Sequence, residues 1–226
     1  MQSRNLQSVG LALVSLIAGV LIGLVGGQVF NISDETVTDV DEQPPTSQTA
    51  VADFRAKFNV SASQYTELTY NAMVDEYDDA PDSRLAAERA EAASEDLLDI
   101  FKVVYSDEEL EDFSDALAAF NSSLDMYVLA SKDESASGIA EAESEISEAT
   151  SALGASLESL TEEELSADDL TDRFNDYTDG LTRAFNAAVA GNYDESYGHL
   201  DESRRNSLDI SDDLAEAVII ANKDEF

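Results

Sequence analysis

The chain has 226 residues, of which 49 are Asp or Glu and 12 are Lys or Arg, so its formal net charge is −37. This balance argues against nucleic acid as a partner, because binding it depends on Lys and Arg side chains that neutralise phosphates. The absence of cysteine excludes disulfides, thiolate metal sites and catalytic thiols.

The acidic composition resembles that of proteins from salt-adapted organisms, haloarchaea in particular. A compact chain with this charge repels itself at ordinary ionic strength, whereas at molar salt the Debye length falls to about 3 Å and screens the repulsion. The apolar content of 43% is arranged periodically, which favours a folded chain over a disordered one. Because acid is spread through the whole chain, no single carboxylate stands out as catalytic.

Residues 9–27 form an uncharged, mostly apolar stretch (VGLALVSLIAGVLIGLVGG). As a helix rising about 1.5 Å per residue, it nearly spans a hydrocarbon core about 30 Å thick. We therefore predict a transmembrane anchor in residues 1–30. The alternative is a cleaved signal peptide, whose apolar region normally covers about 7–15 residues and ends in an A-x-A-like site. Val25-Gly26-Gly27 matches that site poorly.

Charge asymmetry around this segment predicts its orientation. Arg4 and the terminal amine precede it, whereas acidic residues follow from Asp34 to Glu42. The positive-inside rule then places the N-terminus in the cytoplasm and the rest of the chain outside a membrane that it crosses once.

Small residues recur every four positions within the predicted span. Such a strip lets a second helix approach closely, although glycine is also frequent in membrane helices generally. The candidate helix-packing residues are Ser15, Gly19, Gly23 and Gly27.

Residues 31–48 hold Pro44-Pro45, several acids and little apolar material, which predicts a disordered tether. Residues 49–226 would then be the extracytoplasmic domain. This part is almost free of strand signals and rich in apolar residues spaced three and four apart. The stripes run from Val51 to Met73, Ala86 to Val104, Leu110 to Tyr127, Ile139 to Leu160, Leu170 to Val189 and Tyr193 to Ala221.

We therefore predict an all-α fold, an antiparallel bundle of about five or six long helices with the aromatic residues in its core. Ser106 and Glu109 form a capping-box pattern at the start of one helix. The segment from Gly191 to Ser196 resembles the turn of tetratricopeptide repeats, but no copy lies about 34 residues away. A helical hairpin explains it, with Gly191 in the left-handed conformation and Asn192 capping the next helix.

Motifs for catalysis or cofactor binding are absent. His199 is the only histidine, no G-x-S-x-G elbow accompanies it, and there is no calcium loop, Walker loop or G-x-G-x-x-G. We expect no catalytic, cofactor or metal site and no enzymatic activity. Three sequons make Asn31, Asn59 and Asn121 candidates for N-glycosylation.

These observations favour a non-enzymatic, membrane-anchored extracytoplasmic domain that acts through protein–protein interaction as a scaffold, an accessory subunit or a cell-envelope component. Its partner is expected to be another protein or a second copy of the chain. The alternative is a ligand-sensing or solute-binding bundle that works with a membrane partner and resembles the extracellular helical domains of membrane sensors. A hydrolase with paired carboxylates would need two acids in contrasting environments.

Salt should stabilise this chain. We expect helicity, measured by circular dichroism, to fall when molar salt is replaced by dilute buffer, because the acidic side chains then repel each other unscreened. Unchanged helicity after desalting would contradict this expectation.

Overall fold

The computed structural model describes residues 47–226, and these form six α-helices without a strand. The helices are α2 (Ser47–Tyr77), α3 (Ser83–Phe101), α4 (Glu111–Lys132), α5 (Ala136–Leu160), α6 (Ala167–Val189) and α7 (Tyr193–Ala221). The predicted all-α fold is confirmed for this part of the chain. None of these helices has the length and apolar character needed to cross a membrane. The predicted span in residues 1–30 lies outside the described residues.

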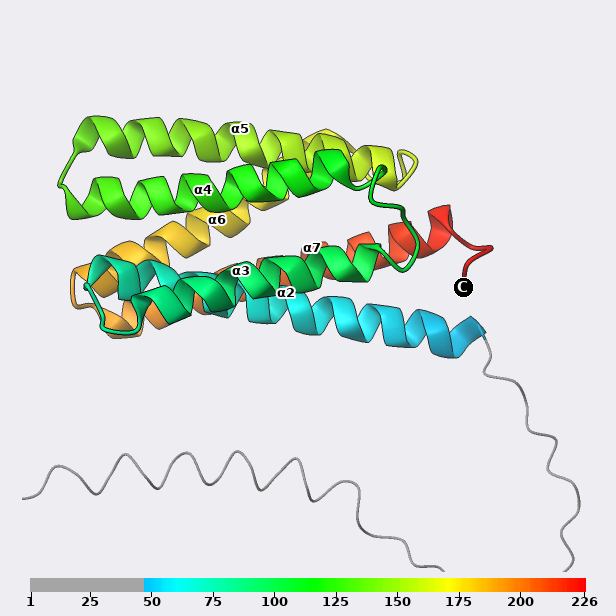
Figure 1. Cartoon of the computed structure of the whole chain (residues 1–226), viewed down its shortest axis with the longest axis horizontal. Helices are drawn as coiled ribbons and strands as arrows, with labels where there is room; N and C mark the ends of the chain where they lie inside the picture. The colour runs from blue at the N-terminus through cyan, green and yellow to red at the C-terminus, as the bar shows by residue number, and fades with distance from the viewer. Residues whose placement is uncertain (1–46) are drawn as a thin grey trace, which may run out of the picture. The chain divides into compact units, whose positions relative to one another are not determined.

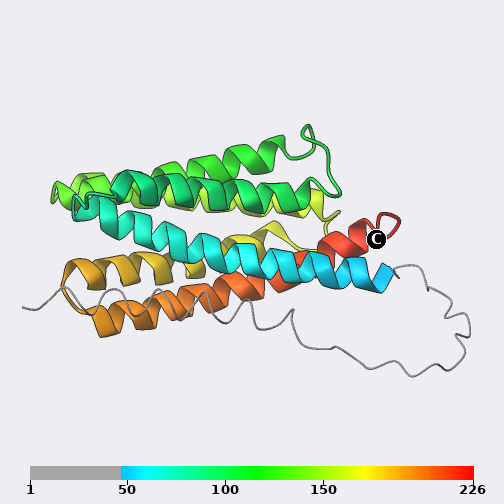
Figure 2. The ribbon, with the colours of Figure 1, turned by 60° about the horizontal axis from the view of Figure 1, so that its bottom comes forward.

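The helices run alternately in opposite directions and form an incomplete ring (Figure 1). Around the ring, α3 packs on α2, α2 on α7, α7 on α6, α6 on α5 and α5 on α4. α2 also reaches across to α4 and α6. The backbones of the last pair, α3 and α4, do not come comparably close to each other. Figure 2 shows the same unit from a second direction. One side of the bundle therefore remains open.

The core contains apolar side chains from all six helices. Every apolar residue predicted for the stripe from Leu110 to Tyr127 is buried. Phe101 contacts Phe58 and Phe113 with ring centroids 5.2 and 5.0 Å apart, so α2, α3 and α4 meet at one aromatic cluster. Such aromatic pairs contribute about 0.5–1.5 kcal/mol beyond their buried area.

The buried polar residues in the described part of the chain are all Ser or Thr, and no charged residue is buried there. The interior of a chain this acidic is therefore electrically neutral.

The prediction for α7 is partly wrong. Tyr193 and Tyr197 were expected in its buried stripe, but they are 64% and 67% exposed. Buried serines take their place in the first half of the helix. Ser203 Oγ donates to the Tyr177 carbonyl oxygen at 2.9 Å, and Ser207 Oγ donates to the Ala62 carbonyl oxygen at 3.2 Å. These small side chains satisfy their own hydroxyls and let α7 approach α2 and α6 closely.

The predicted capping residues form only part of the expected bonds. Ser106 N–H and Oγ donate to the Glu109 carboxylate at 2.8 and 2.7 Å, which lowers the pKa of Glu109. This capping box closes a separate turn, however, because α4 begins only at Glu111. Gly191 has the expected left-handed backbone, with φ of 78°. Asn192 occupies the N-cap of α7, but its side chain makes no capping hydrogen bond.

Two glycines provide a matched test of helix packing. A Cβ atom at Gly154 would lie 2.6 Å from the Ala167 carbonyl oxygen, whereas at Gly198 it would meet nothing within 4 Å. We expect Gly154→Ala to cost about 1–3 kcal/mol through overpacking of α5 against α6. Gly198→Ala should instead stabilise α7 by about 0.5–1 kcal/mol, because alanine loses less entropy in a helix.

The measurement is guanidinium unfolding of the two variants beside the wild type. Equal effects of the two substitutions would show that α5 and α6 are not packed as described.

Candidate functional site

A large groove occupies the open side of the ring, between α3 and α4. We call it the α3–α4 groove, and its volume is about 730 Å³. α3 and α4 provide its walls, and α2 provides its floor. The α3 wall consists of Arg84, Ala87, Glu88, Ala90, Glu91, Ser94, Glu95 and Leu98. The α4 wall consists of Ser114, Leu117, Ala118, Asn121, Ser122, Leu124, Asp125 and Leu129, and the floor of Thr69, Ala72, Met73 and Glu76.

The composition of α3 explains why the groove is open. This helix buries only Ala93, Ser94, Ile100 and Phe101, so its second half holds it to the bundle. Ala90, expected in a contact stripe, is only partly buried, and Ala87 is exposed. The first half of α3 is mostly alanine, glutamate and arginine, and its one large apolar residue, Leu85, does not line the groove, so no apolar contact there pulls α3 against α4.

One polar link crosses between the walls. Tyr65 of α2 donates its hydroxyl proton to Asn121 Oδ1 at 2.5 Å, and Asn121 Nδ2 donates to Ser94 Oγ of α3 at 3.1 Å. This chain of bonds joins three helices at the middle of the groove. It sets the separation of the walls, because a hydrogen bond holds its two partners at a narrow range of distances.

The floor of the groove contains an unsatisfied polar atom. Thr69 is 5% exposed and lines the groove, and its fully buried Oγ1 makes no hydrogen bond of ordinary geometry with the described residues, although it lies near enough to the Tyr65 hydroxyl to oppose the rise in the pKa of Tyr65. Leaving a buried hydroxyl unpaired costs about 1–3 kcal/mol.

Negative charge predominates along the groove. The carboxylates are Glu76, Glu88, Glu91, Glu95 and Asp125, and the single cation is Arg84. Arg84 is already paired with Glu88. Crowding of the Asp125 carboxyl by the surrounding protein, together with the charge of Glu76, raises the pKa of Asp125 above its ordinary value. The residues that line the groove thus include more carboxylates than cations to neutralise them.

Lys132 fixes α4 to the floor of the groove at its open end. Its Nζ donates to the Glu76 carbonyl oxygen at 2.9 Å and to Asp79 Oδ1 at 2.5 Å. The Glu76 carbonyl lies in the last turn of α2, where a cation is favourable for the helix dipole. This contact ties α4 to α2 without involving α3.

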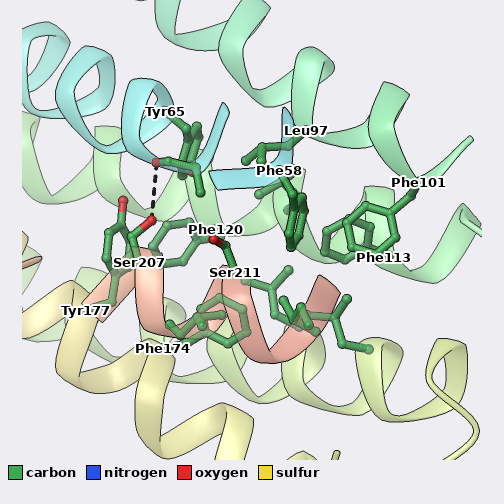
Figure 3. A pocket seen from close by; sticks show the side chains of 16 residues that line it. Phe58, Tyr65, Leu97, Phe101, Phe113, Phe120, Phe174, Tyr177, Ser207 and Ser211 are labelled. Atoms are coloured by element: carbon green, nitrogen blue, oxygen red, sulfur yellow. Dashed lines mark hydrogen bonds between the residues drawn. The ribbon is translucent and has the colours of Figure 1, made fainter. Parts of the chain in front are cut away.

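A separate, apolar cavity of about 70 Å³ lies in the middle of the bundle, where all six helices contribute to its wall. Figure 3 shows Tyr177 extending from α6 toward α2, beside Ser207. Tyr177 is 4% exposed, and its hydroxyl makes no hydrogen bond of ordinary geometry with the described residues, the Thr66 hydroxyl being the nearest candidate. Burial raises the pKa of the Tyr177 phenol, although neighbouring Thr66 opposes the shift. Leu117 lines both this cavity and the α3–α4 groove.

The structure places two of the predicted glycosylation sites within helices. Asn59 of α2 donates to Asp212 Oδ1 of α7 at 2.6 Å, and Asn121 takes part in the polar link described above. Both amides are therefore already engaged, and glycan attachment stays a prediction. Asn31 and the strip of Ser15, Gly19, Gly23 and Gly27 lie outside the described residues.

His199 lies on α7 between two glutamates. Its Nδ1 is 3.5 Å from Glu202 Oε2, and its Nε2 is 3.8 Å from Glu195 Oε1. The imidazole is 25% exposed. Residues 47–226 contain no group of three or more potential ligands that could hold a metal ion.

The groove itself is the feature that sequence reasoning missed. Helical periodicity identifies which residues of α3 are apolar, but not whether α3 has one neighbour or two. The available signal was the composition of the segment Ala86–Ala93, in which alanine and glutamate replace the Leu and Phe of the other stripes.

Comparison of the chain with models of known protein families, with curated protein sequences and with solved structures gives no match.

Tyr177 and Tyr127 form a matched pair for a stability test. We expect Tyr177→Phe to stabilise the domain by about 1 kcal/mol, because it removes an unpaired buried hydroxyl. Tyr127→Phe should cost about 1 kcal/mol, because the Tyr127 hydroxyl accepts a hydrogen bond from Asn186 Nδ2 at 2.8 Å.

Chemical denaturation of both variants in molar salt measures the difference. A loss of stability in Tyr177→Phe equal to that in Tyr127→Phe would show that the Tyr177 hydroxyl has a partner, such as an ordered water.

Proposed function

We propose that residues 47–226 are a protein-interaction domain whose α3–α4 groove receives a helix from a partner protein, and that the domain acts by binding rather than catalysis. The observation that carries this proposal is the open position in the ring of helices. Each of the other neighbouring pairs in the ring packs closely, whereas α3 and α4 leave about 730 Å³ between them. Helix-in-groove binding is a common mode of recognition between proteins.

The shape of the groove and the small size of the central cavity favour this function over ligand sensing. Pockets for small molecules are typically about 300–1,000 Å³. The α3–α4 groove falls within this range, but it is elongated and open along its length between two helices. The central cavity of about 70 Å³ is far smaller, and a water molecule alone occupies roughly 30 Å³ of liquid. We therefore assign binding to the groove and not to the cavity.

The arrangement of exposed apolar residues supports binding at the end of the bundle remote from residue 47. α2 begins and α7 ends at one end of the bundle (Figure 1). Within residues 47–226, six of the nine exposed large hydrophobic residues belong to the helix ends at the opposite side. These are Leu85, Met126, Leu129, Val189, Tyr193 and Tyr197. Leu129 also lines the groove.

We further propose that this domain stands outside the cell membrane of a salt-adapted organism. The predicted anchor in residues 1–30 and the tether in residues 31–48 support this placement, together with the acids that follow the anchor. A tether attached near Ser47 leaves the exposed apolar end directed away from the point of attachment. The domain would then present its groove to soluble or membrane-bound partners.

Site-specific photocrosslinking in cells tests the proposed function. Ala118 is exposed and lines the groove, whereas Ser144 is exposed on α5 away from it. We expect p-benzoylphenylalanine at position 118 to yield an adduct of defined mass with another protein, because a bound helix would lie within reach. The same probe at position 144 should yield none.

No adduct at position 118, or the same adducts at both positions, would contradict the proposal. An adduct with twice the mass of this chain would identify the partner as a second copy.

A further inference from the structure

We propose that the helix bound in the α3–α4 groove is basic and amphipathic, with small apolar residues toward the floor and Lys or Arg side chains toward the walls. This inference rests on the proposed function and specifies the chemistry of the partner. It follows from the length of the groove, the size of its lining residues and its charge.

The dimensions of the groove suit a short helix. From Arg84 to Leu98 the α3 wall is about 21 Å long, because a helix rises 1.5 Å per residue. A partner helix of about four turns would fill this length. Small side chains on both walls, such as Ala87 and Ala118, let a third helix approach its neighbours closely. Ala72 and Met73 of the floor lie between the two walls.

The charge of the groove selects a basic partner. Carboxylates come from all three helices that form it: Glu76 from α2, Asp125 from α4, and Glu88, Glu91 and Glu95 from α3. Arg84 is paired with Glu88, and Lys132 at the end of α4 is paired with Asp79. The raised pKa of Asp125 indicates that its ionised form is poorly compensated in the free protein. A lysine or arginine brought beside Asp125 and Glu91 would supply the missing cation.

The charge also makes other occupants unfavourable. A second copy of this chain would bring acidic helices, since the net charge is −37, and carboxylates would then face carboxylates. The apolar segment 9–27 of the chain itself contains no charged residue and would leave the wall carboxylates unpaired.

Three designed helical peptides test this inference against the full chain in lipid nanodiscs. The peptides share one face of small apolar residues, and their flanking positions carry lysine, glutamine or glutamate. Binding is measured by fluorescence anisotropy in molar salt, where the Debye length of about 3 Å leaves only direct ion pairs effective. We expect the lysine peptide to bind about tenfold more tightly than the glutamine peptide, and the glutamate peptide not to bind.

Neutral variants of the groove provide the control for charge. The double variant Glu91→Gln with Asp125→Asn should lose the preference for the lysine peptide, because the two carboxylates that face the partner become neutral. The double variant Glu143→Gln with Glu148→Gln removes the same charge from exposed positions of α5 and should keep the preference. Circular dichroism of both variants checks that the fold is retained.

Equal binding of the three peptides, or no binding of any, would overturn this inference. If position 118 still crosslinks to a partner in cells, the interaction function stands and only the chemistry of the partner is wrong. If both experiments fail, the proposed function fails with it. Binding of the glutamine peptide more tightly than the lysine peptide would instead indicate an apolar occupant such as segment 9–27.

Discussion

The acidic side chains set the conditions under which these helices pack. Burying a carboxylate without a partner costs several kcal/mol, and 12 basic residues cannot pair with 49 acidic ones. The described core accordingly contains apolar residues and the hydroxyls of Ser and Thr, but no charged residue. The specific polar contacts in the interior are therefore made by neutral groups. Ser203, Ser207 and Tyr65 each bond across a helix interface, which fixes the register of the helices without burying charge.

The position of α2 follows from the same constraint. It contacts α3, α4, α6 and α7, and it brings Phe58 and Tyr65 to the centre of the bundle. α3 depends on α2 and on the cluster at Phe101, since the first half of α3 is mostly alanine and charged residues. A helix that is soluble on most of its surface cannot close against α4. The α3–α4 groove is thus a consequence of composition: carboxylates keep α3 hydrated, and alanine gives it too little apolar surface to close the gap.

Sequence periodicity predicted most of this fold. The stripe through Phe113, Phe120 and Tyr127 is buried as expected, and so is the stripe of α5 from Ala142 to Leu160. These helices were predictable because large apolar residues recur on one face and acids occupy the other. The first half of α7 was not, because its buried residues are serines. Serine is also common on exposed helix surfaces. A buried serine differs only in that its hydroxyl bonds to an acceptor on the neighbouring helix.

The groove was less predictable than the helices. Alanine packs at close helix contacts and is equally tolerated in water. The alanines of α3 were therefore expected to pack against neighbouring helices, but only Ala93 is fully buried. Asn121 bonds to Ser94, which lies 27 residues away in the chain, whereas no distant group bonds to Thr69. Local sequence patterns predict neither the contact nor its absence. The residues predicted to anchor the chain in a membrane lie outside the described part, and their roles remain predictions.

Amide hydrogen exchange of α3 tests the central claim most directly, because the claim requires the first half of α3 to be held on one side only. In the full chain without a partner, the amides of the first half of α3 should exchange much faster than those of α5, which packs against both α4 and α6. Protection of the first half of α3 equal to that of α5 would mean that α3 is closed against α4. The groove would then not be available to a partner.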